Sequence, residues 1–190
     1  MPPPPVLLLP PPPGDAPALR VLIAARFSGD PPPALQRVPP GTPAPPGTPP
    51  QPLPLLRSPG GALLGPGAAA LLLSPPRLRG RDPREAALVR QWVAFAEGDL
   101  ATAAAVAMGG PKQARPRGLQ ELLRALGALE SHLSSGRSFL VGDGVTLADV
   151  TVVCALLGPF TQVLDAPSRA PFPGVSRWFL SCARLPQCPQ

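Results

Sequence analysis

The chain has 190 residues, of which 44% are hydrophobic, and its net charge of +6 comes from sixteen arginines and one lysine against eleven acids. This apolar content is sufficient for a buried core. Because the arginines are scattered and no window approaches the roughly eighteen apolar residues of a membrane span, neither nucleic-acid binding nor a membrane is indicated.

The first 80 residues contain 25 of the 34 prolines, a composition typical of a heavily looped or partly disordered segment. Short apolar runs between the prolines still have strand and helix patterns. They predict a strand over 6–9, a helix over 16–27, a second strand over 35–38, two strands around a Ser-Pro-Gly-Gly turn over 53–64, and a helix over 67–73. Their order is strand, helix, strand, hairpin, helix.

From residue 84 the pattern changes to helices alone. Apolar residues recur at three- and four-residue steps, which predicts an amphipathic helix from 84 to 108 and another from 119 to 133. A wholly apolar helix follows Thr146, and a last helix spans 174–185. The interpretation is two domains: 1–76, then a linker over 77–83, then an all-helical domain over 84–186.

The stretch "FLVGDGVTLADVTVVCALL" (139–157) places Thr146 and Asp149 three residues apart at the start of the apolar helix. This spacing is that of a capping box, in which the first residue caps the helix and the acid bonds back to the cap. A catalytic Asp149 is the alternative, but no histidine or second acid lies near it in the sequence. The structural role is therefore favoured.

The three cysteines, Cys154, Cys182 and Cys188, form neither a disulfide framework nor, with the single His132, a zinc site. No metal and no cofactor is therefore expected. The opening residues lack the basic start and the apolar length of a signal peptide. A reduced, cytoplasmic setting follows.

A capping box that opens a central buried helix and is preceded by "FLVG" resembles the C-terminal domain of the glutathione transferase superfamily. The N-terminal order of elements is similar to the thioredoxin-like domain of that superfamily, in a degenerate, proline-rich form. The resemblance implies a fold of a thioredoxin-like half followed by an all-helical half. It also places a cis-proline at Pro54, before the third strand.

Several sequence segments show a closer similarity, to two groups of translation proteins. These segments include "VRQWVAFAEGDL", "PFTQVLDAPSR" and "SRWFLSCARLPQ". One group is the N-terminal appendage of vertebrate valine–tRNA ligases, and the other is the N-terminal domain of elongation factor 1-gamma. The leading hypothesis is a non-catalytic ligase appendage that tethers its enzyme to the elongation factor 1 complex. An elongation factor 1-gamma-type scaffold subunit is the alternative.

The residues that the superfamily uses for chemistry are missing from the matching positions, so no catalytic residue is predicted. The chain has no tyrosine, no serine before Ser28 and no cysteine before Cys154, so the loop directly after the first strand has no side chain to activate a thiol. Gly65 and Pro66 stand where the superfamily binds the γ-glutamyl group of glutathione with an acid and a hydroxyl. One histidine and one lysine cannot supply both synthetase signatures. An active glutathione transferase is thus the least favoured function.

Protein docking remains, with an elongation factor 1 subunit or another glutathione-transferase-like module as the expected partner. In related modules the arginine of an "RWF" motif lies at a pairing surface, which makes Arg177 the candidate contact. Trp178 and Phe179 are expected to pack inward. Trp92 and Phe95 are likewise expected in the core.

Overall fold

The computed structural model describes the chain except residues 1–4, 10–15, 30–32, 40–53, 59 and 189–190. It divides into two compact units, Met1–Pro75 and Pro76–Gln190. No helix in the described part is both long and apolar enough to cross a membrane.

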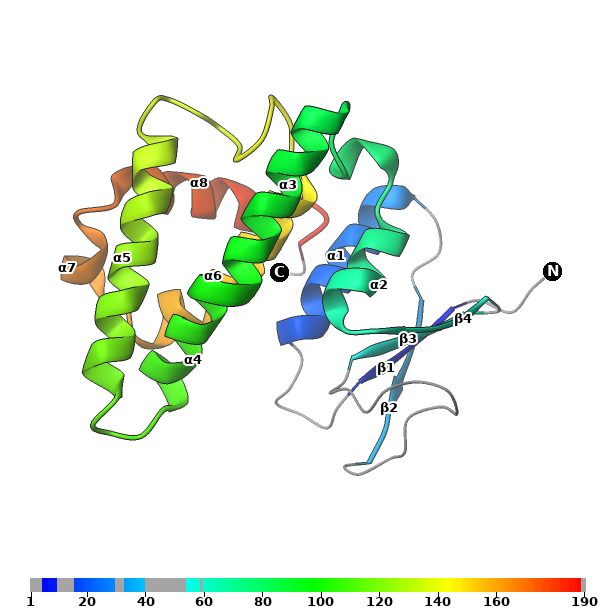
Figure 1. Ribbon diagram of the computed structural model, residues 1–190, viewed down its shortest axis with the longest axis horizontal. Coiled ribbons are helices and arrows are strands. Elements are labelled where there is room, and N and C mark those ends of the chain that lie inside the picture. The colour runs from blue at the N-terminus through cyan, green and yellow to red at the C-terminus, as the bar shows by residue number, and fades with distance from the viewer. Residues whose placement is uncertain (1–4, 10–15, 30–32, 40–53, 59, 189–190) are drawn as a thin grey trace. The chain divides into compact units, whose positions relative to one another are not determined.

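The first unit is a four-stranded mixed sheet with two helices, as the sequence predicts (Figure 1). The strand order is β2-β1-β3-β4, in which β2 runs parallel to β1 and the β3–β4 hairpin runs antiparallel. The elements are β1 (Val6–Leu9), α1 (Ala16–Ser28), β2 (Ala34–Arg37), β3 (Leu55–Ser58), β4 (Gly61–Leu64) and α2 (Pro66–Leu73).

Buried leucine pairs join β1 and β3 at the centre of the sheet. Leu7 lies opposite Leu56 and Leu8 lies opposite Leu55, and all four side chains are at most 5% exposed. Because successive side chains of a strand point to opposite faces, these two pairs fill both faces of the sheet. Helices α1 and α2 pack against each other.

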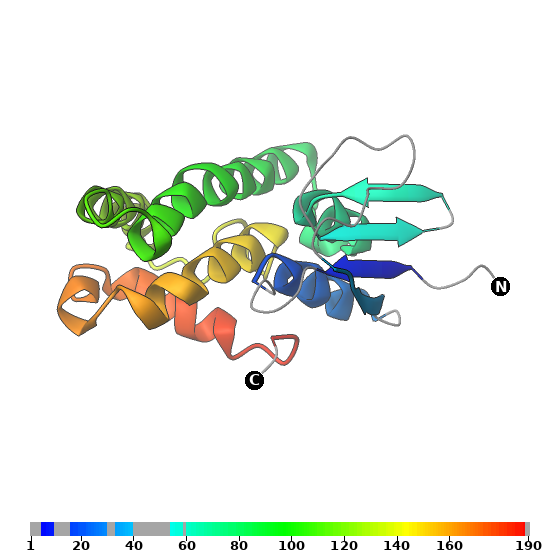
Figure 2. The ribbon, with the colours of Figure 1, turned by 90° about the horizontal axis from the view of Figure 1, so that it is seen from below.

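The second unit is all-helical and centres on α6 (Leu147–Gln162). Figure 2 shows α6 running between the α3–α4 segment and α8. The other elements are η1 (Pro76–Leu78), α3 (Pro83–Phe95), η2 (Ala96–Leu100), α4 (Ala101–Gly109), α5 (Arg115–Leu133), α7 (Ala166–Arg169) and α8 (Pro173–Ala183).

Two helical features of this unit differ from the sequence expectation. The predicted helix over 84–108 contains a π-helical segment, η2, which joins α3 to α4. A π turn adds one residue to a turn, and apolar spacing alone does not reveal it. Phe95 precedes this segment and is only half-buried, although its edge meets Trp92 with ring centroids 5.5 Å apart. The four-residue helix α7 was also not predicted.

Thr146 and Asp149 form a capping box at the start of α6. One carboxylate oxygen of Asp149 accepts hydrogen bonds from the backbone N–H and the hydroxyl of Thr146, each at 2.9 Å. The other oxygen accepts from the N–H of Leu140 and from the indole Nε1 of Trp178, also at 2.9 Å. Asp149 is fully buried. Burial raises the pKa of this carboxyl group, and the four hydrogen bonds oppose that effect.

Substitution of the cap should destabilise the protein. Thr146→Ala removes the hydroxyl that bonds a buried carboxylate, so we expect a loss of ~1–2 kcal/mol of unfolding free energy. For a chain of this size, the loss corresponds to a melting temperature lower by roughly 2–8 °C. Thermal denaturation followed by circular dichroism measures it.

Two controls separate the cap from a general effect of the substitution. Thr146→Ser keeps the hydroxyl and should retain most of the stability. Thr102→Ala, at an exposed position of α4, should change the melting temperature little. A Thr146→Ala protein that melts with the wild type would contradict the role of the cap.

Candidate interaction surface

Helix α8 carries the Arg-Trp-Phe sequence singled out above, and its two faces differ sharply. Trp178 is 2% exposed and Phe179 is 7% exposed, whereas Arg177 is exposed to solvent. The aromatic side chains thus belong to the core, as expected, and Arg177 lies on the surface.

The inner face of α8 is tied to the start of α6. The indole N–H of Trp178 donates to Asp149, 29 residues earlier in the chain, inside the buried cluster described above. A hydrogen bond to a charged group in a buried site is worth more than an exposed one. The capping box therefore also fixes the position of α8.

The N-terminus of α8 is capped from another helix. Its own cap residue, Phe172, offers no side-chain hydrogen bond. Instead the two carboxylate oxygens of Glu130, on α5, accept from the backbone N–H groups of Gly174 at 3.0 Å and Val175 at 2.8 Å. A Cβ atom at Gly174 would lie 2.9 Å from the Glu130 carboxylate, so a larger residue there would displace this carboxylate.

A stack of side chains completes the support. The ring of Phe179 stacks on Phe160 of α6 with centroids 4.2 Å apart. The guanidinium of Arg169, on α7, lies 5.6 Å from the centroid of the same Phe160 ring, at cation–π range. Helix α8 is thus held by α5 and α6, and α7 contacts the Phe160 ring on which Phe179 stacks.

The outward side of α8 presents a basic and apolar strip. Arg177 and Leu180 lie on α8, and Arg184 is the C-cap residue directly after it, where its backbone N–H still donates to the carbonyl of Leu180. These three residues, which we call the α8 outer face, recur at steps of three and four and so share one side of the helix. Leu180 is 50% exposed, and it is the one large hydrophobic residue of the described second unit with so much exposure. Both arginines are exposed.

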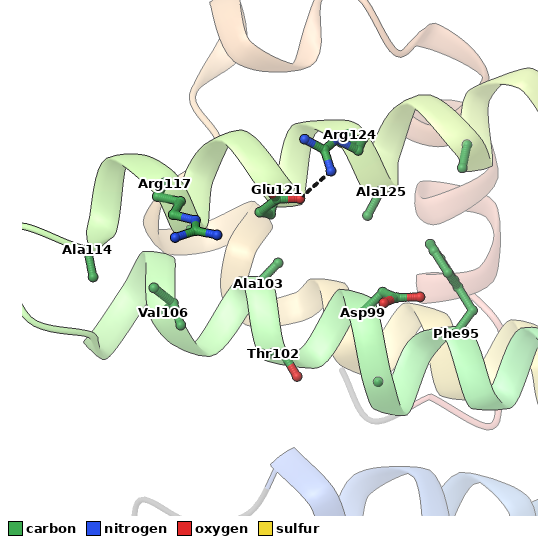
Figure 3. A pocket seen from close by; sticks show the side chains of 13 residues that line it. Phe95, Asp99, Thr102, Ala103, Val106, Ala114, Arg117, Glu121, Arg124 and Ala125 are labelled. Atoms are coloured by element: carbon green, nitrogen blue, oxygen red, sulfur yellow. Dashed lines mark ion pairs between the residues drawn. The ribbon is translucent and has the colours of Figure 1, made fainter.

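A groove between α4 and α5 is the second surface feature of this unit (Figure 3). It has a volume of about 800 Å³, and Phe95 and Asp99 line one end while Ala114 and Arg117 line the other. On its rim Arg124 pairs with Glu121 at 2.9 Å.

The first unit places Gly65 and Pro66 at the start of α2, where the resemblance implies a γ-glutamyl site. Gly65 has φ +82°, a conformation that side-chain-bearing residues rarely adopt. Pro66 stands in the first turn and has no backbone N–H to offer an anion. No side chain caps this helix. The loop that follows β1 lies outside the described residues.

Pro54 is buried directly before β3. The cis form of its peptide bond stays a prediction.

None of the three cysteines, Cys154, Cys182 and Cys188, forms a disulfide bond, and burial raises the pKa of the Cys182 thiol. A raised pKa disfavours the reactive thiolate. Among the described residues, no group of three histidine, cysteine or acidic side chains could hold a metal ion.

The chain is similar to known proteins in its sequence. Residues 93–186 match the family of the glutathione S-transferase C-terminal domain. Elongation factor 1-gamma of Equus caballus is 45% identical over 127 residues, which cover 63% of this chain. The match covers 29% of that protein, so the chain spans less than a third of the length of these relatives.

Solved structures show the same fold. The glutathione S-transferase-like domain of elongation factor 1-gamma from Saccharomyces cerevisiae superposes with a TM-score of 0.73, covering 97% of this chain and 90% of that one at 17% identity. A possible glutathione S-transferase from Rhodopseudomonas palustris gives a TM-score of 0.76 at 19% identity, covering 98% and 89%. The chain has a glutathione-transferase-like fold, as predicted.

Loss of the cap on α8 should be measurable. Glu130→Gln leaves one oxygen to accept a hydrogen bond and removes the charge beside the positive end of the helix, so we expect a loss of ~1 kcal/mol. The melting temperature should fall by roughly 2–4 °C. Glu121→Gln, in an exposed ion pair on the same helix, is the matched control and should cost less than ~0.5 kcal/mol. Equal melting of the two variants would show that Glu130 does not cap α8.

Proposed function

We propose that this chain, with its glutathione-transferase-like fold, is a non-catalytic docking module of the elongation factor 1 assembly, in the manner of an elongation factor 1-gamma scaffold subunit. The observation that carries the proposal is the 45% identity to elongation factor 1-gamma over 127 residues. The partners we propose are elongation factor 1 subunits or another glutathione-transferase-like module, in the cytoplasm.

The two residues at the start of α2 support the proposal that the chain is non-catalytic. Gly65 has no side chain to receive a γ-glutamyl amine, and Pro66 has neither a hydroxyl nor an N–H. An acid at position 65 would have to adopt φ +82°, which costs strain. This site therefore lacks the groups by which a glutathione transferase holds its substrate.

A second candidate is the N-terminal appendage of a valine–tRNA ligase. The sequence "SPGGALLGPGAAALLL", which spans β4 and α2, resembles that appendage more than the elongation factor. A transcript in which this sequence continues into a catalytic synthetase body would identify the ligase. Both candidates assign the same docking role to the helical unit.

The α8 outer face is the proposed docking surface. Arg177 is exposed there on a helix that α5 and α6 support. A planar guanidinium can stack on a partner and donate several hydrogen bonds at once, which lysine cannot reproduce. A rigid arginine of this kind is a frequent energetic centre of protein interfaces.

The purified chain should not bind glutathione. Isothermal calorimetry with reduced glutathione should give no saturable heat up to millimolar ligand, since the γ-glutamyl site lacks its acid and hydroxyl. A conjugation assay with an electrophilic substrate should give the rate of the buffer alone. Saturable binding in the micromolar range would exclude a purely scaffolding function.

Arg177 should matter for partner capture. The tagged chain is used to precipitate partners from cytosol, and elongation factor 1 subunits are identified by mass spectrometry. Arg177→Ala should weaken their capture about thirtyfold, which corresponds to ~2 kcal/mol for a central contact. Arg90→Ala, an exposed arginine on α3, is the control and should capture them like the wild type.

The wild-type capture tests the docking function, and the Arg177→Ala capture tests the choice of surface. If the wild-type chain captures no elongation factor 1 subunit and no synthetase, the docking function is wrong. If it captures one and Arg177→Ala captures it equally well, the function holds and the surface lies elsewhere.

A further inference from the structure

We propose that the α8 outer face binds an acidic amphipathic helix of a partner protein, with two carboxylates seven residues apart on Arg177 and Arg184 and an apolar side chain over Leu180. The inference rests on the docking function proposed above and names the chemistry of the partner.

The spacing of the three side chains sets the pattern of the partner. Arg177 and Arg184 are seven residues apart, or about 10.5 Å along the helix axis at 1.5 Å per residue. Leu180 lies between them on the same side. A partner helix that packs alongside would match this strip with acids at positions i and i+7 and a leucine at i+3 or i+4.

The charges on this face are available for a partner. Helix α8 contains no acidic residue. Within the described residues, neither Arg177 nor Arg184 takes part in an ion pair through its side chain. The exposed half of Leu180 is apolar surface that a partner would remove from water. A partner helix with an acidic strip and a central apolar residue would pair with both arginines and cover Leu180.

The face is also rigid before binding. Glu130 fixes the first turn of α8, the bond from Trp178 to Asp149 fixes its middle, and Phe179 stacks on Phe160. A preformed helix avoids the ordering cost that a flexible segment incurs on binding. The helix that carries Arg177 and Leu180 is therefore in place before a partner arrives.

The same features disfavour two other occupants. Two copies of the chain would bring four arginines and no acid together on this face, which is repulsive. A single-stranded nucleic acid needs aromatic platforms for its bases, but both aromatic residues of α8 are buried. A helix with complementary acids is the occupant that the charge pattern selects.

The experiment uses a fluorescent helical peptide as the probe and the full 190-residue chain as the receptor. The acidic peptide has an alanine-rich sequence of roughly 18 residues, long enough for helix formation, with glutamates at i and i+7 and leucine at i+3. A matched peptide carries lysine in place of both glutamates. Fluorescence anisotropy should show saturable binding of the acidic peptide with Kd of about 100 μM or below at low salt, and binding of the lysine peptide at least tenfold weaker.

Charge reversal tests the pairing itself. The double variant Arg177→Glu/Arg184→Glu should bind the acidic peptide at least tenfold more weakly and the lysine peptide more tightly than the wild type does. The control Arg90→Glu/Arg117→Glu makes the same change of net charge at exposed sites on α3 and α5, and it should keep the wild-type preference. Circular dichroism should be the same for all three proteins.

Several results would overturn the inference. One is that the acidic peptide shows no saturable binding to the wild type. Another is that it binds the double variant and the control equally well. Dimerisation of the wild type in sedimentation that the double variant abolishes would make a second copy the occupant. Binding of polyuridylate that only the double variant loses would make it a nucleic acid.

The outcome is separable from that of the proposed function. If the chain captures elongation factor 1 subunits from cytosol but ignores the acidic peptide, the partner chemistry is wrong and the function stands. If the peptide binds with the charge dependence described and no elongation factor 1 subunit is captured, the partner chemistry stands and the function is wrong.

Discussion

The helical unit depends on one buried carboxylate. Asp149 accepts four hydrogen bonds, from the loop at Leu140, from the backbone and hydroxyl of Thr146, and from the indole of Trp178. Each donor is removed from water, so each would lose its partner if the acid were absent. An unpaired carboxylate at this depth would be costly, and the donors make the site tolerable. Loop, central helix and last helix are thereby fixed by one residue.

This cluster links the fold to the surface that we assign to docking. Trp178 reaches inward to Asp149, and the residue before it, Arg177, faces outward. Because the two side chains are neighbours on one helix, the bond that secures the first also orients the second. Glu130 adds a cap from a different helix, which replaces the side-chain cap that Phe172 does not provide. The outer face of α8 is therefore presented by the core rather than by a flexible loop.

The first unit keeps a four-stranded sheet in a proline-rich stretch of the sequence. Its leucine pairs, such as Leu7 with Leu56, maintain the sheet despite the many prolines around it. Short strands need only a few buried pairs, and loops tolerate proline well. The start of α2 is formed by Gly65 and Pro66, which provide a turn and a helix start but no polar side chain.

The sequence by itself determined the order of the elements, the two-part fold and the spacing of Thr146 and Asp149, because periodicity and capping are local properties of the chain. It also indicated that Trp178 is buried and that Arg177 could face outward. It did not reveal the π-helical segment after Phe95, since an inserted residue leaves no mark in the apolar pattern. Nor could it pair Trp178 with Asp149, or Glu130 with the start of α8, because these bonds join residues 29 and 44 or more positions apart. Only the tertiary structure decides which distant donors meet a buried carboxylate.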